Sequence, residues 1–231
     1  MTASADALKR QAALRVLDYV HDGMVIGLGS GTTAEICAAE VGRRVRQGLR
    51  VVGVPSSQKT ARVAREAGLP LSALNDHRRL DLTFDGADEI DLRTFSLIKG
   101  RGGSLLCEKL VATASNLQII IADGSKLVTT LGERMPVPVE VVKFGWRRTA
   151  EALERLGGSP ALRERDGQPF VSDEGHYILD TRFGPIEDAE RLATALKLLV
   201  GVVEHGLFLG LAQCIIVAGS DGVQVYERPT R

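Results

Sequence analysis

The chain has 231 residues, and its 29 lysines and arginines balance 29 aspartates and glutamates, so the formal charge is zero. A nucleic-acid-binding module carries a strong basic excess, so this balance disfavours a polyanionic partner. With 44% hydrophobic and 25% charged residues, the composition is typical of a globular protein. Glycine is enriched, at 25 residues or about 11% against a usual share of roughly 7%, which indicates tight turns and close backbone approaches.

The cysteine content and the chain start indicate a cytoplasmic protein. The three cysteines are odd in number and far apart, which disfavours a disulfide framework or a metal-ligand cluster: Cys37, Cys107 and Cys214. The first residues lack the basic start of a secretory signal. Near the other end, the apolar stretch 198–217 contains Glu204 and His205, which disfavours a membrane span.

Apolar residues recur at helical spacing between Ala7 and Leu17, which predicts a first helix. The elements expected next alternate between strand and helix: a strand at 24–28, a helix at 33–47, a strand at 49–54, a helix at 57–67, and strands at 80–84 and 117–122. This alternation is typical of a parallel sheet covered by helices, an α/β Rossmann-like domain. The last two strands are each followed by an aspartate, and the carboxyl ends of such strands bind ligands.

The pattern of predicted elements changes near residue 132, and the Met-Pro-Val-Pro segment 135–138 marks a domain boundary. The elements expected beyond it are a strand at 139–142, a helix at 146–156, strands at 161–165 and 177–180, and a long helix at 185–199 that begins with proline. They predict a smaller α+β domain of split βαβ, ferredoxin-like type, and final strands at 214–218 and 223–226 are expected to rejoin the main sheet. We predict a catalytic domain of residues 1–131 plus 205–231 and a small domain of residues 132–204.

The segment Gly27–Ala34 lies between a predicted strand and a predicted helix. Its glycines let backbone amides approach an anion at the positive helix N-terminus, which indicates a phosphate site with hydroxyls from Ser30, Thr32 and Thr33. The segment also fits a dinucleotide pattern, but the next strand ends at 54–57 without the acid that holds a ribose. A tight turn with Thr32 or Thr33 as the helix cap explains this motif alone equally well.

Residues 85–91, Asp-Gly-Ala-Asp-Glu-Ile-Asp, place four carboxylates directly after a predicted strand. Crowded carboxylates repel one another unless a cation, a metal or substrate hydroxyls compensate. Three interpretations remain open: a divalent-metal site, an acid–base pair acting on a sugar, and a solvated turn. Because Gly86-Ala87 keeps Asp85 and Asp88 close together at the end of a strand, we favour a functional role.

Residues 99–104, Lys-Gly-Arg-Gly-Gly-Ser, form a glycine-rich loop that opens a predicted helix containing Glu108. A partly buried carboxylate about one turn inside a helix can be tuned as a proton-transfer base. The loop is no Walker motif, because no Lys-Ser/Thr pair follows at the required glycine spacing. Taken singly, Glu108 is better explained as a surface residue beside Lys109.

Lys126 ends the segment Asp-Gly-Ser-Lys after the strand at 117–122, where it can meet a phosphate as a point charge, although lone lysines in turns are usually solvated. The histidines lack the spacing of a metal site on one helix, and each is better explained as structural or exposed: His21, His77, His176 and His205.

These elements, in this order and spacing, closely resemble ribose-5-phosphate isomerase of the A type over essentially the whole chain. The segments that carry the resemblance are Gly27–Ala34, Ser56–Thr60, Phe84–Glu89, Lys99–Lys109, Ala122–Lys126 and His205–Phe208. The Asp-Gly-Ala-Asp-Glu segment combined with the lysine–glycine loop and its Glu-Lys end is a specific combination.

The resemblance implies interconversion of D-ribose 5-phosphate and D-ribulose 5-phosphate in the non-oxidative pentose phosphate pathway, without cofactor or metal. By position, it makes Glu108 the proton acceptor, with Asp85, Asp88 and Lys99 as further catalytic residues. The implied substrate-binding residues are Lys9, Ser30, Gly31, Thr32, Thr33, Asp85, Gly86, Ala87, Asp88, Lys99, Gly100, Arg101, Gly102 and Lys126. It also implies a small sugar phosphate as partner and a homodimer or homotetramer.

Two positions depart from the family's usual pattern. Arg101 interrupts the glycine loop where a small residue is usual, and Cys107 precedes Glu108 where a basic or polar residue is frequent. We expect the Arg101 side chain to point to solvent; the alternative is an added cation near the phosphate or the acidic segment.

Two functions of other classes compete with the isomerase. A non-catalytic sugar-phosphate sensor is disfavoured because the chain has no helix-turn-helix extension or basic excess and keeps Glu108 with both aspartates. An acyl-CoA transferase subunit has a related architecture and a glutamate nucleophile, but residues 85–88 and Lys126 favour a sugar phosphate.

Overall fold

The computed structural model describes residues 5–219 and 221–229, apart from the side chains of residues 5, 6 and 9. The chain forms two compact units. Unit 1 comprises the described residues up to Ala87, Cys107–Lys126 and those from Gly210 onward; unit 2 comprises Asp88–Leu106 and Leu127–Leu209. The segments 88–106, 127–131 and 205–209 therefore pack with unit 2, whereas the sequence-based division places them in the larger domain.

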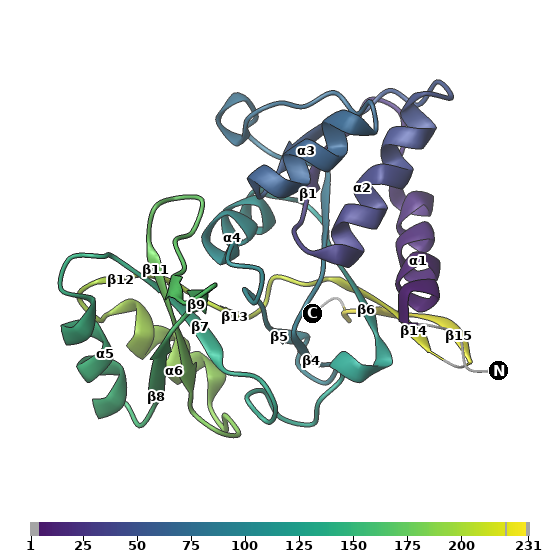
Figure 1. Cartoon of the computed structure of the whole chain (residues 1–231). Coiled ribbons are helices and arrows are strands. Elements are labelled where there is room, and N and C mark those ends of the chain that lie inside the picture. The colour runs from purple at the N-terminus through teal and green to yellow at the C-terminus, as the bar shows by residue number, and fades with distance from the viewer. Residues whose placement is uncertain (1–4, 220, 230–231) are drawn as a thin grey trace. The chain divides into compact units, whose positions relative to one another are not determined.

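Unit 1 is built on a six-stranded sheet (Figure 1). Its strands, in spatial order, are β15 (Gly222–Glu227), β14 (Cys214–Gly219), β6 (Gln118–Asp123), β3 (Leu82–Asp85), β1 (Val25–Leu28) and β2 (Val52–Pro55). Neighbouring strands are parallel except β15, which pairs antiparallel with β14. The predicted parallel sheet is confirmed, and so is the return of the C-terminal strands to it.

Helices cover both faces of this sheet. The helices of unit 1 are α1 (Ala5–Val16), α2 (Thr32–Val45), α3 (Gln58–Glu66) and α4 (Leu105–Ala114, described from Cys107 onward as part of this unit). Short 3-10 turns form at η1 (Leu17–Tyr19), η2 (Leu74–Asp76) and η3 (Gly124–Lys126). Side chains alternate along β1, so Ile26 and Leu28 face the larger core while Gly27 faces Val111 of α4. The helices α1 to α3 therefore pack on the face opposite α4.

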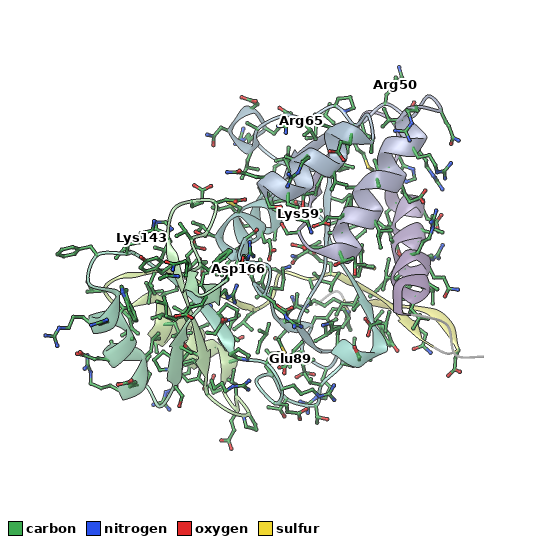
Figure 2. All side chains as sticks on the ribbon, in the orientation of Figure 1. Arg50, Lys59, Arg65, Glu89, Lys143 and Asp166 are labelled. Atoms are coloured by element: carbon green, nitrogen blue, oxygen red, sulfur yellow. The ribbon has the colours of Figure 1, made fainter. Side chains whose placement is uncertain are left out.

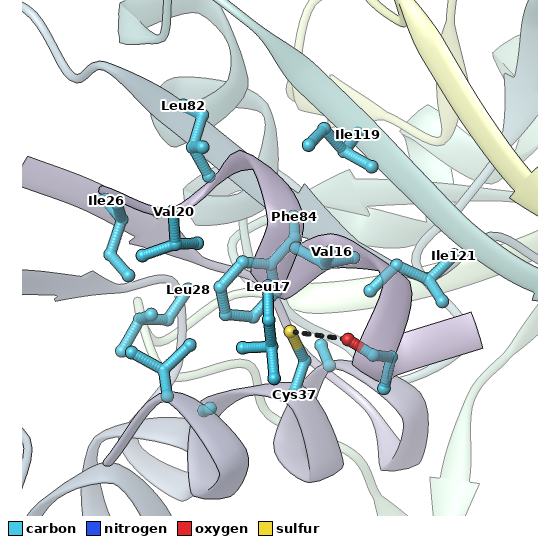
Figure 3. Packing of buried hydrophobic residues seen from close by; sticks show 14 of the residues in the cluster. Val16, Leu17, Val20, Ile26, Leu28, Cys37, Leu82, Phe84, Ile119 and Ile121 are labelled. Atoms are coloured by element: carbon cyan, nitrogen blue, oxygen red, sulfur yellow. Dashed lines mark hydrogen bonds between the residues drawn. The ribbon is translucent and has the colours of Figure 1, made fainter. Parts of the chain in front are cut away.

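The larger core lies between α1, α2 and the strands, as Figure 3 shows. Phe84 of β3 is completely buried there, and burying such a side chain stabilises the fold by about 1.5–3 kcal/mol. Cys37 of α2 lies in the same core, where its Sγ donates to the Ala13 carbonyl at 3.7 Å. Burial, followed by the charge of Glu40, raises the pKa of the Cys37 thiol well above its ordinary value.

Unit 2 contains a four-stranded antiparallel sheet in the order β12 (Val202–His205), β7 (Val137–Val141), β11 (Tyr177–Arg182), β8 (Ser159–Leu162). With α5 (Trp146–Arg155) after β7 and α6 (Ala189–Lys197) after β11, the chain order is that of the predicted split βαβ fold. The prediction that the last helix of this unit begins at Pro185 is wrong. It begins at Ala189, because the Asp188 side chain caps it by accepting from the Arg191 amide at 2.9 Å.

Unit 2 also holds short strands that the sequence does not predict. A three-stranded sheet joins β4 (Glu89–Asp91), β5 (Ser96–Ile98) and β13 (Leu207–Phe208). A hairpin joins β9 (Glu164–Arg165), which is the end of the strand predicted at 161–165, to the unpredicted β10 (Gln168–Pro169). Each strand has only two or three residues, too few to show a periodic pattern. Within the described ranges, no helix is long and apolar enough to cross a lipid bilayer.

Candidate active site

The turn from β1 to α2 requires glycine at two positions. A Cβ at Gly29 would lie 2.3 Å from the Asp85 carboxyl carbon, so only glycine lets β1 end beside that aspartate. Gly31 caps α2 with φ at 88°, and no side chain caps this helix. The interpretation of Thr32 or Thr33 as the cap is wrong, because both lie inside the helix. The N-cap residue of α2 therefore supplies no capping side chain.

Hydroxyl groups surround this turn. The Ser30 and Ser56 Oγ atoms are 2.9 Å apart, and the Thr60 hydroxyl donates to the Gly29 carbonyl at 2.9 Å. Lys59, which follows the same loop on α3, forms an ion pair with Glu35 at 2.9 Å (Figure 2). Ser56 is the contact that sequence reasoning missed, because no spacing rule links a serine after β2 with one after β1.

Asp85 is the last residue of β3 and is only 2% exposed. Its Oδ1 accepts hydrogen bonds from the Ser30 amide at 3.0 Å and the Gly86 amide at 2.8 Å. The β1 turn and the start of the acidic segment therefore lie side by side within unit 1, since neighbouring parallel strands end at the same edge. Two amides fix the direction of this carboxylate.

The acidic run 85–91 does not form one cluster. Glu89, 1% exposed and labelled in Figure 2, accepts from the amides of Gly132, Arg134 and Met135 at 2.6–2.7 Å. Asp91 pairs with the Arg93 guanidinium at 3.2 Å. These two carboxylates hold the backbone of unit 2, and their donors relieve the repulsion expected from the sequence. Among the described residues, no group of three or more His, Cys, Asp or Glu side chains has an arrangement that could hold a metal ion.

Lys99 leaves β5 as a buried residue, 2% exposed, in unit 2. Its amide donates to the Gly206 carbonyl at 2.9 Å, and a Cβ at Gly206 would lie 2.3 Å from the Lys99 carbonyl oxygen. The Lys99 Nζ lies 5.3 Å from the centroid of the Phe208 ring, within the range of a cation–π contact. The segment His205–Phe208 therefore fixes the lysine's backbone and faces its charge with an aromatic ring.

The glycine loop after Lys99 turns sharply, with φ at 105° for Gly100 and 91° for Gly103. Arg101 is exposed, consistent with the expected solvent-facing side chain, and its amide donates to Asp88 Oδ2 at 2.9 Å. Asp88, in unit 2, thus holds the loop from one side.

Glu108 is only 4% exposed in the first turns of α4, so the interpretation of it as a surface residue is wrong. Lys126 is half-buried at the end of η3, after a turn in which Asp123 accepts from the Ser125 amide at 3.0 Å. Lys9 belongs to the α1 backbone, but its side chain lies outside the described residues.

The predicted site residues fall into two sets. Unit 1 holds Ser30, Gly31, Thr32, Thr33, Asp85, Gly86, Ala87, Glu108 and Lys126; unit 2 holds Asp88, Lys99, Gly100, Arg101 and Gly102. The chain passes from unit 1 to unit 2 at Ala87–Asp88 and back at Leu106–Cys107. The two catalytic segments of the prediction, 85–88 and 99–108, therefore each include one of these crossings.

The chain matches the family model of ribose 5-phosphate isomerase A (phosphoriboisomerase A) over residues 52–222. It is 53% identical to a ribose-5-phosphate isomerase A from Gloeobacter violaceus over 95% of this chain and 96% of the relative. A ribose 5-phosphate isomerase A structure from Methanocaldococcus jannaschii, 37% identical, superposes with a TM-score of 0.93 over 97% of this chain and all of that chain. A ribose-5-phosphate isomerase solved in complex with phospho-erythronic acid is 33% identical to this chain. It superposes with a TM-score of 0.94 over 98% of this chain and 100% of that chain. The chain belongs to the ribose 5-phosphate isomerase A family.

Proposed function

We propose that Glu108 is the base of an aldose–ketose isomerisation, with Asp85, Asp88, Lys99 and a phosphate site at the start of α2 as its partners. The overall reaction is the interconversion of D-ribose 5-phosphate and D-ribulose 5-phosphate, the activity of the family. The observation that carries the role of Glu108 is its burial, because a carboxylate 4% exposed at the start of a helix is shielded from competing water.

The chemistry requires one proton to move between neighbouring carbons. After the furanose ring opens, the base removes the C2 proton of the aldose, and the electrons of the broken C–H bond form the C1–C2 double bond of an enediolate. The protonated Glu108 then returns the proton to C1, while the hydroxyl proton at O2 is transferred to O1, so that C2 becomes the ketone and C1 carries a hydroxyl. The substrate is isomerised without net oxidation, so the proposed reaction needs no redox cofactor. In the proposed mechanism a buried lysine, and not a metal, meets the developing charge.

The negative charge that develops on the enediolate oxygens needs a fixed positive partner. Lys99 suits this role, because its backbone is held by Gly206 and its side chain is buried. Asp85 and Asp88 would bind the ring and chain hydroxyls and assist ring opening. Both have an oxygen already oriented by backbone amides, which supports a defined hydrogen-bonding direction.

The phosphate would bind at the N-terminus of α2, where backbone amides and the helix dipole favour an anion. Ser30, Thr32 and Thr33 supply hydroxyls there, and Lys126 and Lys9 supply charge. Binding energy at the phosphate would position the reacting carbons at the other end of the substrate. The complex of a relative with phospho-erythronic acid, a phosphorylated sugar acid, supports this class of ligand.

The finer predictions about assembly and location also belong to this proposal. We expect the protein to act in the cytoplasm as a homodimer or homotetramer, without a nucleic-acid or membrane partner. A neutral formal charge supports the expectation that no nucleic acid is bound.

The deciding experiment is to measure ribulose 5-phosphate formation from ribose 5-phosphate with and without a chelator. We expect the same rate in both. Turnover that vanishes on chelation would refute the metal-free mechanism, and binding of ribose 5-phosphate without turnover would favour the sensor.

A further inference from the structure

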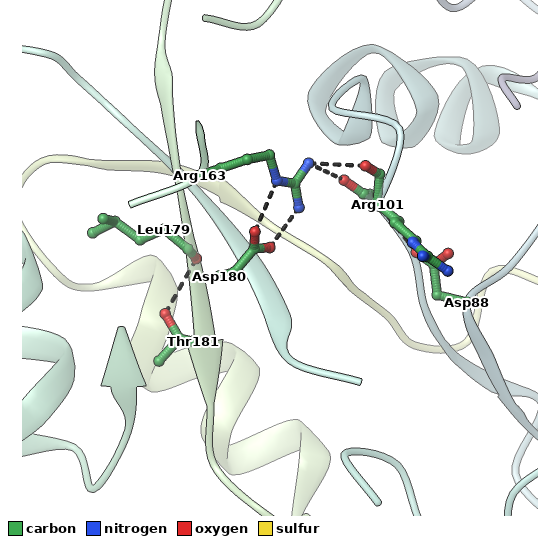
Figure 4. Close-up of polar contacts among 7 residues, drawn as sticks. Asp88, Arg101, Arg163, Leu179, Asp180 and Thr181 are labelled. Carbon is green, nitrogen blue, oxygen red and sulfur yellow. Dashed lines mark hydrogen bonds and ion pairs between the residues drawn. The ribbon is translucent and has the colours of Figure 1, made fainter. Parts of the chain in front are cut away.

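We infer that Arg163, a residue of unit 2 distant in sequence from every predicted site residue, is a positioning residue that fixes the backbone of the loop 99–103. The inference rests on the proposed function, because the loop matters for catalysis only if Lys99 and its neighbours act on the substrate. Figure 4 shows the contacts that carry it.

Arg163 lies just after β8, where its amide donates to the Ile178 carbonyl at 2.9 Å. Its Nη1 atom donates to two carbonyl oxygens of the loop, Gly100 at 2.9 Å and Arg101 at 3.1 Å. Residues 99–104 lie between β5 and α4, outside any strand or helix. The Gly100 carbonyl accepts from the Gly103 amide at 3.0 Å, and side-chain donors add further fixed partners for the loop carbonyls. Arg163 supplies these donors.

Asp180 of β11 fixes the guanidinium itself. Its carboxylate accepts from Arg163 Nε at 2.8 Å and from Nη2 at 2.5 Å, a bidentate pair that leaves Nη1 directed at the loop (Figure 4). The Arg163 side chain is only 13% exposed, so the pair is shielded from solvent on one side. Lysine could neutralise Asp180 but lacks the planar fork needed to bind the carboxylate and the carbonyls together.

Two more contacts hold the loop from other directions. Asp88 accepts from the Arg101 amide, so the carbonyl and the amide of the Gly100–Arg101 peptide both meet a charged partner, and the Arg101–Gly102 peptide meets one at its carbonyl. The Phe170 ring lies where a Gly103 side chain would be, 2.4 Å from a Cβ built there. The Phe170 amide in turn donates to the Arg163 carbonyl at 2.8 Å. One hairpin of unit 2 thus contributes the cation and the ring that shape the loop.

The consequence for the reaction is control of position. Lys99 is covalently attached to Gly100, so a loop that relaxes would displace the Lys99 backbone and any loop amide that contacts the substrate. A misplacement of about 1 Å can cost about 10²-fold in rate. Arg163 would therefore act on kcat through the loop without touching the substrate.

The test is Arg163→Ala with added guanidinium ion at concentrations that leave the wild type folded and active. We expect Arg163→Ala to lower kcat by roughly 10- to 100-fold with a smaller change in KM. Added guanidinium should raise the kcat of this variant by at least about threefold. Arg163→Lys should fall between the wild type and Arg163→Ala. Arg148→Ala removes an exposed ion pair with Glu151 from α5 of the same unit, and it should keep wild-type kcat and show no rescue.

Hydrogen–deuterium exchange of residues 99–104 gives a readout independent of activity. Faster exchange there in Arg163→Ala, with β7 unchanged, supports the inference even if the wild type proves inactive, in which case the proposed function alone fails. If Arg163→Ala keeps kcat within twofold, or if exchange in 99–104 is unchanged, the inference is overturned. A loss of kcat explained wholly by unfolded protein, and not rescued by guanidinium, would overturn it as well.

Discussion

The two units hold their parts of the candidate site by different means. In unit 1, the turn after β1 and the carboxylate after β3 are joined through backbone amides, and their proximity follows from parallel strands ending at one edge. In unit 2, the loop after β5 has no such frame. Two backbone bonds, from the Lys99 amide to Gly206 and from the Gly103 amide to Gly100, are supplemented there by the side chains of Arg163 and Asp88, which come from other segments.

The difference teaches that a substrate-binding backbone can be ordered by topology or by side-chain contacts. Topology makes the unit 1 turn sensitive to volume, because strands and helices leave no room to yield. Side-chain contacts make the unit 2 loop sensitive to single polar residues. The predictions below separate chemistry, volume, backbone support and charge in these two regions.

The largest effect is expected from Glu108→Gln. It removes the proposed base but keeps its shape, so kcat should fall by about 10²- to 10⁴-fold while binding of phospho-erythronic acid changes little. Steady-state kinetics and calorimetry measure the two quantities. The matched control is Glu66→Gln at an exposed position of α3. Activity within a few-fold of wild type would remove Glu108 from the base role.

Gly29→Ala should damage the unit 1 turn through added volume. Its Cβ would meet Asp85 at 2.3 Å and the Phe84 carbonyl at 2.5 Å, so we expect a loss of about 1–3 kcal/mol in the free energy of unfolding together with a lower kcat. Gly219→Ala is the control, because nothing lies within 4 Å of a Cβ there. Denaturant titration of both variants decides; equal stabilities would contradict the packing argument.

Glu89→Gln tests whether the acidic run divides into support and chemistry. The neutral side chain can accept fewer strong hydrogen bonds from the three amides, so unfolding should become easier by roughly 1–3 kcal/mol. The folded enzyme should keep kcat within about threefold, in contrast to Asp85→Asn. A large loss of kcat in fully folded Glu89→Gln protein would place Glu89 in the chemistry.

Lys126→Ala should raise KM for ribose 5-phosphate by about tenfold and lower kcat less, because it removes charge that binds the phosphate equally in ground and transition states. Lys143→Ala, at an exposed position of unit 2 labelled in Figure 2, is the control. An unchanged KM would exclude Lys126 from the phosphate site.

The smallest effect is expected at Glu40 of α2. It tests whether the charge of this residue stabilises the fold at neutral pH and no longer does so in acid. The hydrogen bond from Arg43 lowers the pKa of Glu40 below its ordinary value of 4.5. The carboxylate therefore stabilises the fold fully above that ordinary value, and the contribution is lost as pH falls through the lowered one. Glu40→Gln should cost under about 1 kcal/mol at pH 7 and nothing at the acid end of the titration. A cost independent of pH would contradict this.

Long periodic elements could be predicted from the sequence, and short ones could not. The strands of the parallel sheet and the split βαβ order of unit 2 follow from apolar runs and helical spacing. The two- and three-residue strands β4, β5 and β13 form because distant segments meet, which no local pattern records. The start of α6 was misplaced because Pro185 is a weaker start signal than the side-chain cap of Asp188.

The candidate site was predictable as a set of residues and not as a set of contacts. Asp85, Lys99 and Glu108 carry recognisable motifs, whereas their burial depends on tertiary packing. Glu89 lies in the same acidic run as Asp85 and Asp88. Its carboxylate, however, accepts hydrogen bonds from three backbone amides of the segment 132–135. Arg163 belongs to no motif, and only the folded chain brings it to the loop.

The contacts of Arg101 explain how an arginine is tolerated in a glycine loop. Asp88 accepts from its amide and Arg163 donates to its carbonyl. These contacts use main-chain atoms of residue 101, which every residue except proline possesses as a pair. The side chain at this position is therefore open to evolutionary drift or to deliberate exchange. A library of substitutions at residue 101 would offer handles for labelling or immobilising the enzyme beside its own active loop.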